Sequence, residues 1–249
     1  MTLILSLSKN IKGLEEDIKN KLWQKKKVFA SQKKWKFFTK VGKEIAGSDI
    51  IIIAVKPNQY KNVCSDIKKE VTKETIIVSL MAGVKISDLK SQLPSQSNVL
   101  RVMTNINAKY NNAISSLYFD KSFEKTRITS LKKFFSLFGD VRVLKKEADI
   151  DKATALIGSG PAYFFYLLKS YEKKLIPLCD GDKDKANYVM VNLIKGIGMS
   201  VKNNKDLNKL IAAVASKKGT TEAGLKSFKS NNLDKVFEKG ISAAIKRSK

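Results

Sequence analysis

The sequence Ala-Thr-Ala-Leu-Ile-Gly-Ser-Gly-Pro-Ala-Tyr-Phe-Phe, residues 153–165, separates two parts of the chain with different patterns. We expect a turn at Gly158–Gly160, with Ser159 and Gly160 at the N-cap and its lead-in, and Pro161 in the first turn of a long helix. A helix start with free N–H groups at this junction can bind an anion. An ordinary helix start that joins two domains is the alternative, and spacing alone favours it.

The part before this stretch alternates short apolar runs with amphipathic segments. The runs of strand length are Leu3–Leu7, Val28–Ser31, Ile50–Val55, Thr75–Leu80, Asn98–Met103, Ala113–Tyr118 and Val141–Leu144. The helical segments between them are Asn10–Trp23, Phe37–Ile45, Tyr60–Val71, Ile86–Leu93 and Ile128–Phe138. This alternation predicts an α/β domain with a doubly wound parallel sheet, over residues 1–147.

Every segment after Glu147 has the periodicity of a helix. The predicted helices are Ala162–Lys174, Lys185–Lys202, Asp206–Ala215, Thr221–Ser230 and Leu233–Lys246. Residues 148–249 are therefore expected to form an all-α domain. A domain of this size has little core of its own, so we expect it to bury apolar faces against a second copy of the chain.

The composition excludes several kinds of active site. The 249 residues contain no histidine and two distant cysteines, Cys64 and Cys179. This excludes a Ser-His-Asp triad, a Cys-His pair and the usual zinc sites. Free thiols point to a reducing, cytoplasmic location, and no apolar run is long enough to span a bilayer.

The formal charge is +25, from 48 basic and 23 acidic residues. A nucleic-acid-binding function is one interpretation of this charge. Only four of the basic residues are arginines, however, and lysines are scattered through every segment. Surfaces that recognise bases favour arginine, so we expect an anionic small molecule as the partner, with neither nucleic acid nor membrane.

Six motifs occur in an order that resembles the pyrroline-5-carboxylate reductase family, from about Ser48 to Lys249. They are Ser48–Pro57, Val78–Val84, Arg101–Asn105, Phe138–Gly139, Thr154–Tyr163 and Ser216–Leu225. The resemblance implies a Rossmann-type domain that binds NAD(P)H and a helical domain that forms a homodimer or a higher homo-oligomer. It also implies hydride transfer to the imine carbon of 1-pyrroline-5-carboxylate, which gives L-proline. A related reductase for another imine or carbonyl is a further alternative.

The resemblance places the substrate on the helical domain. Thr221 matches the threonine whose hydroxyl lies near the imine nitrogen, and we expect it to orient the substrate or relay a proton. The expected substrate-binding residues are Ser216, Gly219, Thr220, Thr221, Ser159 and Gly160. The alternative role for Thr220 and Thr221 is to cap the helix that follows.

The cofactor is expected at the carboxyl ends of the strands, where open α/β sheets bind ligands. The residues assigned to it are Asn10, Ser31, Lys33, Ala54, Val55, Lys56, Pro57, Ala82, Gly83 and Asn105. For Asn105 the alternative is a turn cap, and for Lys56 a solvated loop lysine. Ser31 and Lys33 suit a 2′-phosphate better than a ribose hydroxyl, which favours NADPH, with NADH as the alternative.

Three departures from the family pattern bear on activity. The first loop reads Leu7-Ser8-Lys9-Asn10-Ile11, without the glycines that bring backbone close to a pyrophosphate. Thr104 and Ile106 interrupt a Met-Pro-Asn-Thr-Pro-like run, and Lys217-Lys218 replaces a Pro-Gly pair. A catalytically impaired relative that acts as a binding or regulatory dimer is therefore the alternative function.

Overall fold

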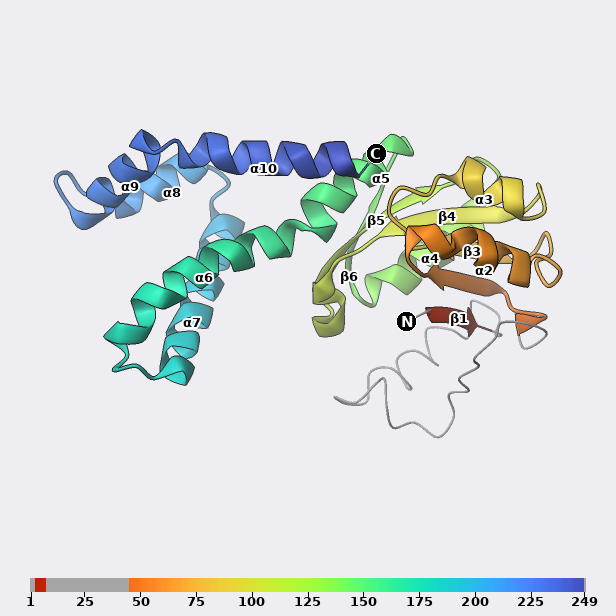
Figure 1. The fold of residues 1–249 in the computed structure, drawn as a ribbon, viewed down its shortest axis with the longest axis horizontal. Helices are drawn as coiled ribbons and strands as arrows, with labels where there is room; N and C mark the ends of the chain where they lie inside the picture. Colours follow the sequence, from red (N-terminus) through yellow and green to blue (C-terminus); the bar gives the residue numbers. More distant parts are fainter. Residues whose placement is uncertain (1–2, 8–44, 249) are drawn as a thin grey trace. The chain divides into compact units, whose positions relative to one another are not determined.

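The computed structural model describes residues 3–7 and 45–248 (Figure 1). The chain divides into two compact units, one reaching Ser159 and including Ile245–Lys249, the other running from Gly160 to Ala244. The predicted helix Asn10–Trp23 and strand Val28–Ser31 lie outside the described residues, as do Asn10, Ser31 and Lys33, and of the predicted helix Phe37–Ile45 only Ile45 is described. No helix among the described residues is long and apolar enough to cross a membrane.

The described part of the first unit contains a six-stranded sheet in which the strands follow one another in chain order. The strands are β1 (Leu3–Leu7), β2 (Ile50–Ala54), β3 (Ile76–Ser79), β4 (Asn98–Met103), β5 (Ala113–Phe119) and β6 (Gly139–Val143). The pairs β2–β3, β3–β4 and β5–β6 are parallel, whereas β1–β2 and β4–β5 are antiparallel.

The predicted α/β class is confirmed, but an all-parallel sheet is wrong at those two pairs. The connection from Met103 to Ala113 is too short for a crossover, so β5 must return antiparallel to β4. The direction of β1 is not encoded in its apolar pattern, because the same alternation suits either direction.

Helices cover both faces of the sheet. Side chains alternate along β2, so Ile51 and Ile53 join the core under α2 (Tyr60–Ile67) and α3 (Ile86–Gln92). Ile50 and Ile52 join the core under α4 (Lys125–Ser136). Burial on both faces explains why β2 is a continuous run of isoleucine.

The stretch around Gly158 is helical, and the predicted glycine turn is wrong. Helix α5 (Ala148–Ala153) runs into a π-helical segment (Thr154–Gly158) and then into α6 (Gly160–Leu178). Ser159 has φ −87° and ψ −18°, and its N–H donates to the Thr154 carbonyl at 2.9 Å. Pro161 has no N–H to continue the i→i−4 ladder, which favours a local change of helix type.

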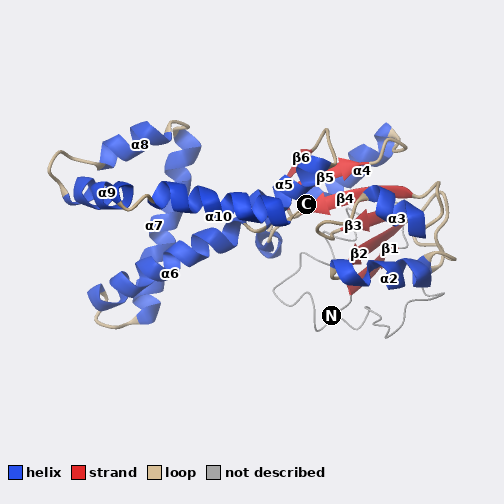
Figure 2. Cartoon of the chain, turned by 45° about the horizontal axis from the view of Figure 1, so that its top comes forward, coloured by secondary structure: helices blue, strands red, loops and turns tan. Residues whose placement is uncertain are grey.

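The second unit consists of helices and their connections (Figure 2). They are α6, α7 (Lys183–Asn203), α8 (Leu207–Val214), α9 (Thr220–Ser230) and α10 (Leu233–Arg247), whose end belongs to the first unit. Phe237 of α10 contacts the rings of Tyr163 and Phe164 on α6. Within this unit only Gly160, Leu175 and Ala186 are buried, so the helices have almost no core of their own.

Lys90 of α3 and Asp120, which follows β5, form an ion pair that joins the two elements. Asp120 also accepts hydrogen bonds from the Ser122 hydroxyl at 2.9 Å and the Lys121 N–H at 2.7 Å. Burial opposes ionisation of the Asp120 carboxyl, but the hydrogen bonds from Lys90, Ser122 and Lys121 outweigh it and lower its pKa.

We predict that Asp120→Asn lowers the free energy of unfolding at pH 7 by about 1 kcal/mol. A carboxyl whose pKa is lower in the folded state stabilises above its unfolded pKa, and this contribution is lost as the pH falls through the folded pKa. The deficit should therefore shrink at low pH in urea unfolding. Asp66→Asn, at an exposed site on α2, is the control, and an equal Asp120→Asn deficit at both pH values would contradict the prediction.

Candidate functional site

The carboxyl ends of β2, β3 and β4 bring the predicted cofactor residues of the described chain to one edge. The three strands are parallel and in register, with Ile53 opposite Ser79 and Ser79 opposite Arg101. Ala54–Pro57, Ala82–Gly83 and Asn105 therefore leave the sheet side by side. This edge is where open α/β sheets bind ligands.

The segments after β2 and β3 place an exposed lysine and an exposed glycine at this edge. Lys56 is exposed, and its carbonyl accepts the Gln59 N–H at 2.9 Å, which starts a short 3-10 helix at Pro57. Gly83 has φ +70°, and a Cβ built there meets only the Ser248 carbonyl, at 4.0 Å. Glycine thus gives the β3–α3 loop a conformation that other residues rarely adopt and leaves its backbone accessible.

Asn105 caps the 3-10 helix Ile106–Tyr110. Its side-chain oxygen accepts the Asn107 N–H at 3.2 Å, so the alternative of a turn cap is confirmed. The amide NH₂ group of Asn105 has two N–H donors that do not take part in this cap. A contact of Asn105 with a nicotinamide ring stays a prediction.

The second group of predicted residues surrounds the start of α9. Residues 216–219 form a tight turn, in which the Gly219 N–H donates to the Ser216 carbonyl at 3.0 Å. A Cβ on Gly219 would lie 2.3 Å from the Ser216 hydroxyl oxygen and 3.1 Å from its carbonyl oxygen, so a larger residue here would displace the Ser216 side chain. Gly219 is the N-cap of α9, so the alternative role of Thr220 and Thr221 as helix caps is wrong.

The first turn of α9 presents unused donors. The Glu222 carboxylate accepts the Lys218 N–H, outside the helix, and the Ala223 N–H is the donor to the Gly219 carbonyl. The N–H groups of Thr220 and Thr221 have no acceptor within the helix. In the described part of the chain neither threonine hydroxyl makes a hydrogen bond, and Thr221 is half-buried. Such a helix start can hold a carboxylate.

Ser159 and Gly160 do not form the expected cradle of free N–H groups. The Ser159 N–H is already bonded to Thr154, and Gly160 is buried. The neighbouring Gly158 fits closely over the end of β4, because a Cβ there would lie 3.1 Å from the Met103 sulfur. Substrate binding by Ser159 and Gly160 stays a prediction.

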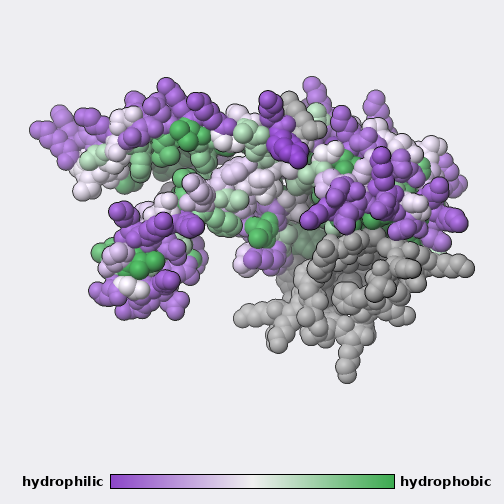
Figure 3. Space-filling model, viewed as in Figure 1, coloured by the Kyte–Doolittle hydropathy of each residue, from purple (hydrophilic) through white to green (hydrophobic). Residues whose placement is uncertain are grey.

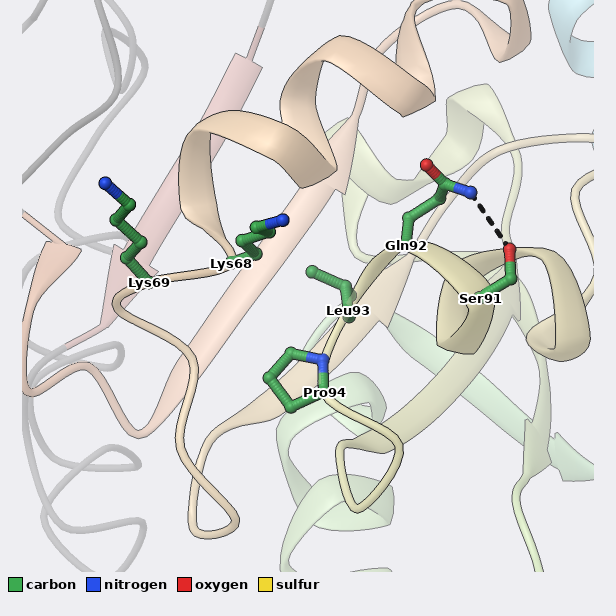
Figure 4. A pocket seen from close by; sticks show the side chains of 6 residues that line it. All are labelled: Lys68, Lys69, Ser91, Gln92, Leu93 and Pro94. Atoms are coloured by element: carbon green, nitrogen blue, oxygen red, sulfur yellow. Dashed lines mark hydrogen bonds between the residues drawn. The ribbon is translucent and has the colours of Figure 1, made fainter.

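The structure also has a hollow of about 400 Å³ at the opposite edge of the sheet (Figure 4). It lies between the carboxyl ends of α2 and α3 and is lined by Lys68, Lys69, Ser91, Gln92, Leu93 and Pro94. These helices return from the carboxyl ends of the strands to the amino ends. The hollow is therefore separate from the predicted cofactor edge and contains none of the predicted site residues.

A buried charge cluster next to the cofactor edge was not assigned a role in the sequence. Arg101 of β4 is 1% exposed and donates to Glu147 Oε1 and Asp151 Oδ1, each at 3.0 Å. The same Glu147 oxygen accepts the Ile86 N–H at 2.7 Å. The signal available in the sequence was an arginine inside a strand and two carboxylates four residues apart, on one face of a helix.

Comparisons with known proteins agree with this architecture. The family model for the pyrroline-5-carboxylate reductase dimerisation domain matches residues 147–249. The family model for ketopantoate reductase PanE/ApbA matches residues 7–122. The pyrroline-5-carboxylate reductase of Pseudomonas aeruginosa is 30% identical over 204 residues, 82% of this chain and 75% of that protein. That of Staphylococcus aureus strain COL is 29% identical over 202 residues, 81% of this chain and 74% of that protein.

Two solved structures extend the comparison. The pyrroline-5-carboxylate reductase of Coxiella burnetii has a TM-score of 0.69 and 28% identity, and the match covers 81% of this chain and 75% of that one. The Plasmodium falciparum pyrroline carboxylate reductase, solved with NADP bound, shares the fold with a TM-score of 0.78 and 24% identity. That match covers 95% of this chain and 92% of that one.

The fold and the site define a class, the NAD(P)-binding proteins with an α/β domain followed by a helical dimerisation domain. Within this class the assignment is specific, because a relative at 30% identity matches across both units. The chain belongs to the pyrroline-5-carboxylate reductase family.

Lys218 gives a test of the turn before α9. It has φ +60°, a left-handed conformation that costs a non-glycine residue about 1–2 kcal/mol. We predict that Lys218→Gly raises the free energy of unfolding by about 0.5–1 kcal/mol, after the added chain entropy of glycine is subtracted. Urea unfolding measures the change. Lys217→Gly is the matched control and should give no gain, and stabilisation by both variants alike would contradict the prediction.

Proposed function

We propose that this chain reduces 1-pyrroline-5-carboxylate to L-proline with NADPH as the hydride donor. The chain is an NAD(P)H-dependent oxidoreductase of its family, which acts in proline biosynthesis. The observation that carries the finer proposal is the half-buried Thr221, whose free hydroxyl lies beside the N–H groups at the start of α9.

The proposed reaction matches the residues present. The cofactor supplies a hydride to the imine carbon, and a proton is added to the nitrogen. The N–H groups of Thr220 and Thr221 and the charges of Lys217 and Lys218 suit the substrate carboxylate. The Thr221 hydroxyl orients the imine nitrogen or passes it a proton. An imine is already electrophilic, so a histidine base is not required.

The cofactor proposal rests on the edge formed by β2, β3 and β4. Small residues at Ala82 and Gly83 leave room for a ring, and Lys56 supplies positive charge beside it. The preference for NADPH over NADH rests on Ser31 and Lys33, which lie outside the described residues. The altered loop Leu7–Ile11 lacks the usual glycines, and we expect it to weaken dinucleotide affinity relative to a glycine loop.

A homodimer, or a higher homo-oligomer, is part of the proposal. The helical unit exposes many large apolar side chains, seen as green surface along its helices (Figure 3). On α7 these include Ile197, which is 54% exposed, and Met199, which is 66% exposed. Surfaces of this kind are stable in water when another protein covers them, and a second copy of the chain is the proposed partner.

A cytoplasmic location is also part of the proposal. Cys64 and Cys179 are both free, as thiols are in a reducing compartment. Burial raises the pKa of the Cys64 thiol to about 11, which keeps it protonated and unreactive.

Proline formation from 1-pyrroline-5-carboxylate and NADPH tests the function. Turnover by the wild-type chain would support it, whereas dinucleotide binding without turnover at high enzyme concentration would favour the catalytically impaired relative. Retention of a DNA or RNA probe near physiological salt would instead favour the nucleic-acid interpretation.

We predict that Thr221→Val lowers kcat at least about 100-fold, the low end for loss of a group that transfers or guides a proton. Thr221→Ser keeps the hydroxyl and should retain most of the activity. Steady-state oxidation of NADPH measures both. A wild-type kcat in Thr221→Val would show that the Thr221 hydroxyl takes no part in catalysis.

The oligomer is tested by placing a charge on α7. We predict that Ile197→Glu shifts the protein from dimer or larger assemblies toward monomer in sedimentation velocity, because burial of an unpaired carboxylate at an apolar interface is unfavourable. Lys202→Glu introduces an acidic side chain on the same helix at an already charged position and should leave the assembly intact. A monomeric wild-type protein would contradict the proposal.

A further inference from the structure

The two terminal nitrogens of the Arg101 guanidinium pair with the carboxylates of Glu147, the N-cap of α5, and Asp151 of α5. Its guanidinium is 1% exposed, and a buried cation is strongly unfavourable unless carboxylates surround it. Glu147 and Asp151 lie one helical turn apart and each accepts one of its terminal N–H groups at 3.0 Å. The Asp151 side chain is 11% exposed and that of Glu147 is 27% exposed, so the pair is largely screened from water. This arrangement joins α5 to the centre of β4.

Glu147 has a second contact that ion pairing with Arg101 does not require. Its Oε1 atom also accepts the N–H of Ile86, the first residue of α3, at 2.7 Å. The preceding N–H, that of Lys85, donates to Asp88 of the same helix at 3.0 Å. Two orphan N–H groups at the start of α3 are therefore satisfied by carboxylates, one local and one 61 residues away.

The loop from β3 to α3 is thereby held at both ends. It leaves the sheet after Ser79, whose hydroxyl accepts the Met81 N–H at 3.4 Å, and it ends at Ile86 on Glu147. Ala82 and Gly83, assigned above to the cofactor, lie between these two points. Gly83 has φ +70° and is exposed, whereas Met81 and Val84, which flank this pair, are buried in the core under α2 and α3.

The end of β4 is held by the same helical run. Gly158, seven residues beyond Asp151, fits against Met103 and Thr104, two and three residues beyond Arg101. One helical run therefore contacts β4 at Arg101 and again where β4 ends, and it contacts the start of α3 through Glu147. Two of the three strand-end segments of the cofactor edge depend on it.

We infer that Glu147 is a positioning residue for dinucleotide binding, which acts by tethering the start of α3 to Arg101 and so setting the path of the loop that carries Ala82 and Gly83. The inference rests on the proposed function in that the loop is taken to contact the dinucleotide. Glu147 acts through the loop backbone and does not touch the cofactor.

Three variants of Glu147 distinguish the effect of its hydrogen bond with Ile86 from the effect of its negative charge. Glu147→Ala removes the acceptor for both Ile86 and Arg101. Glu147→Gln keeps a side-chain oxygen at the same reach but removes the charge, and Glu147→Asp keeps the charge but shortens the side chain. Leu131→Ala is the matched control, because Leu131 is a fully buried residue of α4 in the core on the other face of the sheet.

The first measurement is the Kd for NADP⁺ by isothermal titration, at a temperature where circular dichroism shows every variant folded. We expect Glu147→Ala and Glu147→Asp to raise Kd about 10-fold, the loss that corresponds to one hydrogen bond to a charged acceptor. Glu147→Gln should stay within about 3-fold of wild type, and Leu131→Ala should lower Tm without raising Kd. If Glu147→Ala does not fold, Glu147→Asp carries the test.

The second measurement is amide hydrogen exchange of Ile86 without cofactor. Loss of the tether should accelerate exchange at Ile86 in Glu147→Ala and Glu147→Asp and leave it slow in Glu147→Gln and Leu131→Ala. An unchanged Kd for NADP⁺ in Glu147→Ala and Glu147→Asp would overturn the inference, and so would an equal rise of Kd in Leu131→Ala. A wild-type protein that does not bind NADP⁺ would instead count against the proposed function, and slow Ile86 exchange in Glu147→Ala would overturn the tether by itself.

Discussion

The buried pairing of Arg101 with Glu147 and Asp151 is the interaction on which the rest of the first unit depends. A guanidinium in the centre of a sheet needs carboxylates, and a helix can supply two of them at positions i and i+4. This requirement fixes where α5 lies on β4, and the π-helical segment continues from α5 along the chain. The apolar contacts of α5 alone would not define that position, because hydrophobic burial is not directional.

The two units are stabilised in different ways. In the first, isoleucines on both faces of β2 pack under α2 and α3 on one side and α4 on the other. In the second, only Gly160, Leu175 and Ala186 are buried, and most apolar side chains of α7 are exposed. The helical unit therefore needs a partner surface to remove this area from water, which agrees with its match to a dimerisation domain.

The lysine-rich composition leaves this framework intact because most lysines occupy exposed positions. Lys218 is also exposed, but it has structural consequences, since it adopts φ +60° in the turn before α9. A Cβ on the neighbouring Gly219 would lie 2.3 Å from the Ser216 hydroxyl oxygen, so a side chain there would displace that of Ser216.

The sequence by itself determined the α/β class, the helical second part and, within the described residues, the positions of the strands, because periodicity and β-branched runs are local properties. The strand Asn98–Met103 has the predicted bounds, and the ends of β2, β3 and β4 carry the predicted segments to one edge. Strand direction, the π-helical path through Gly158 and the partners of Arg101 were decided by the tertiary structure. Each depends on which distant residue lies opposite, as Glu147 lies opposite Ile86 from 61 positions away, and no local pattern in the chain encodes that distance.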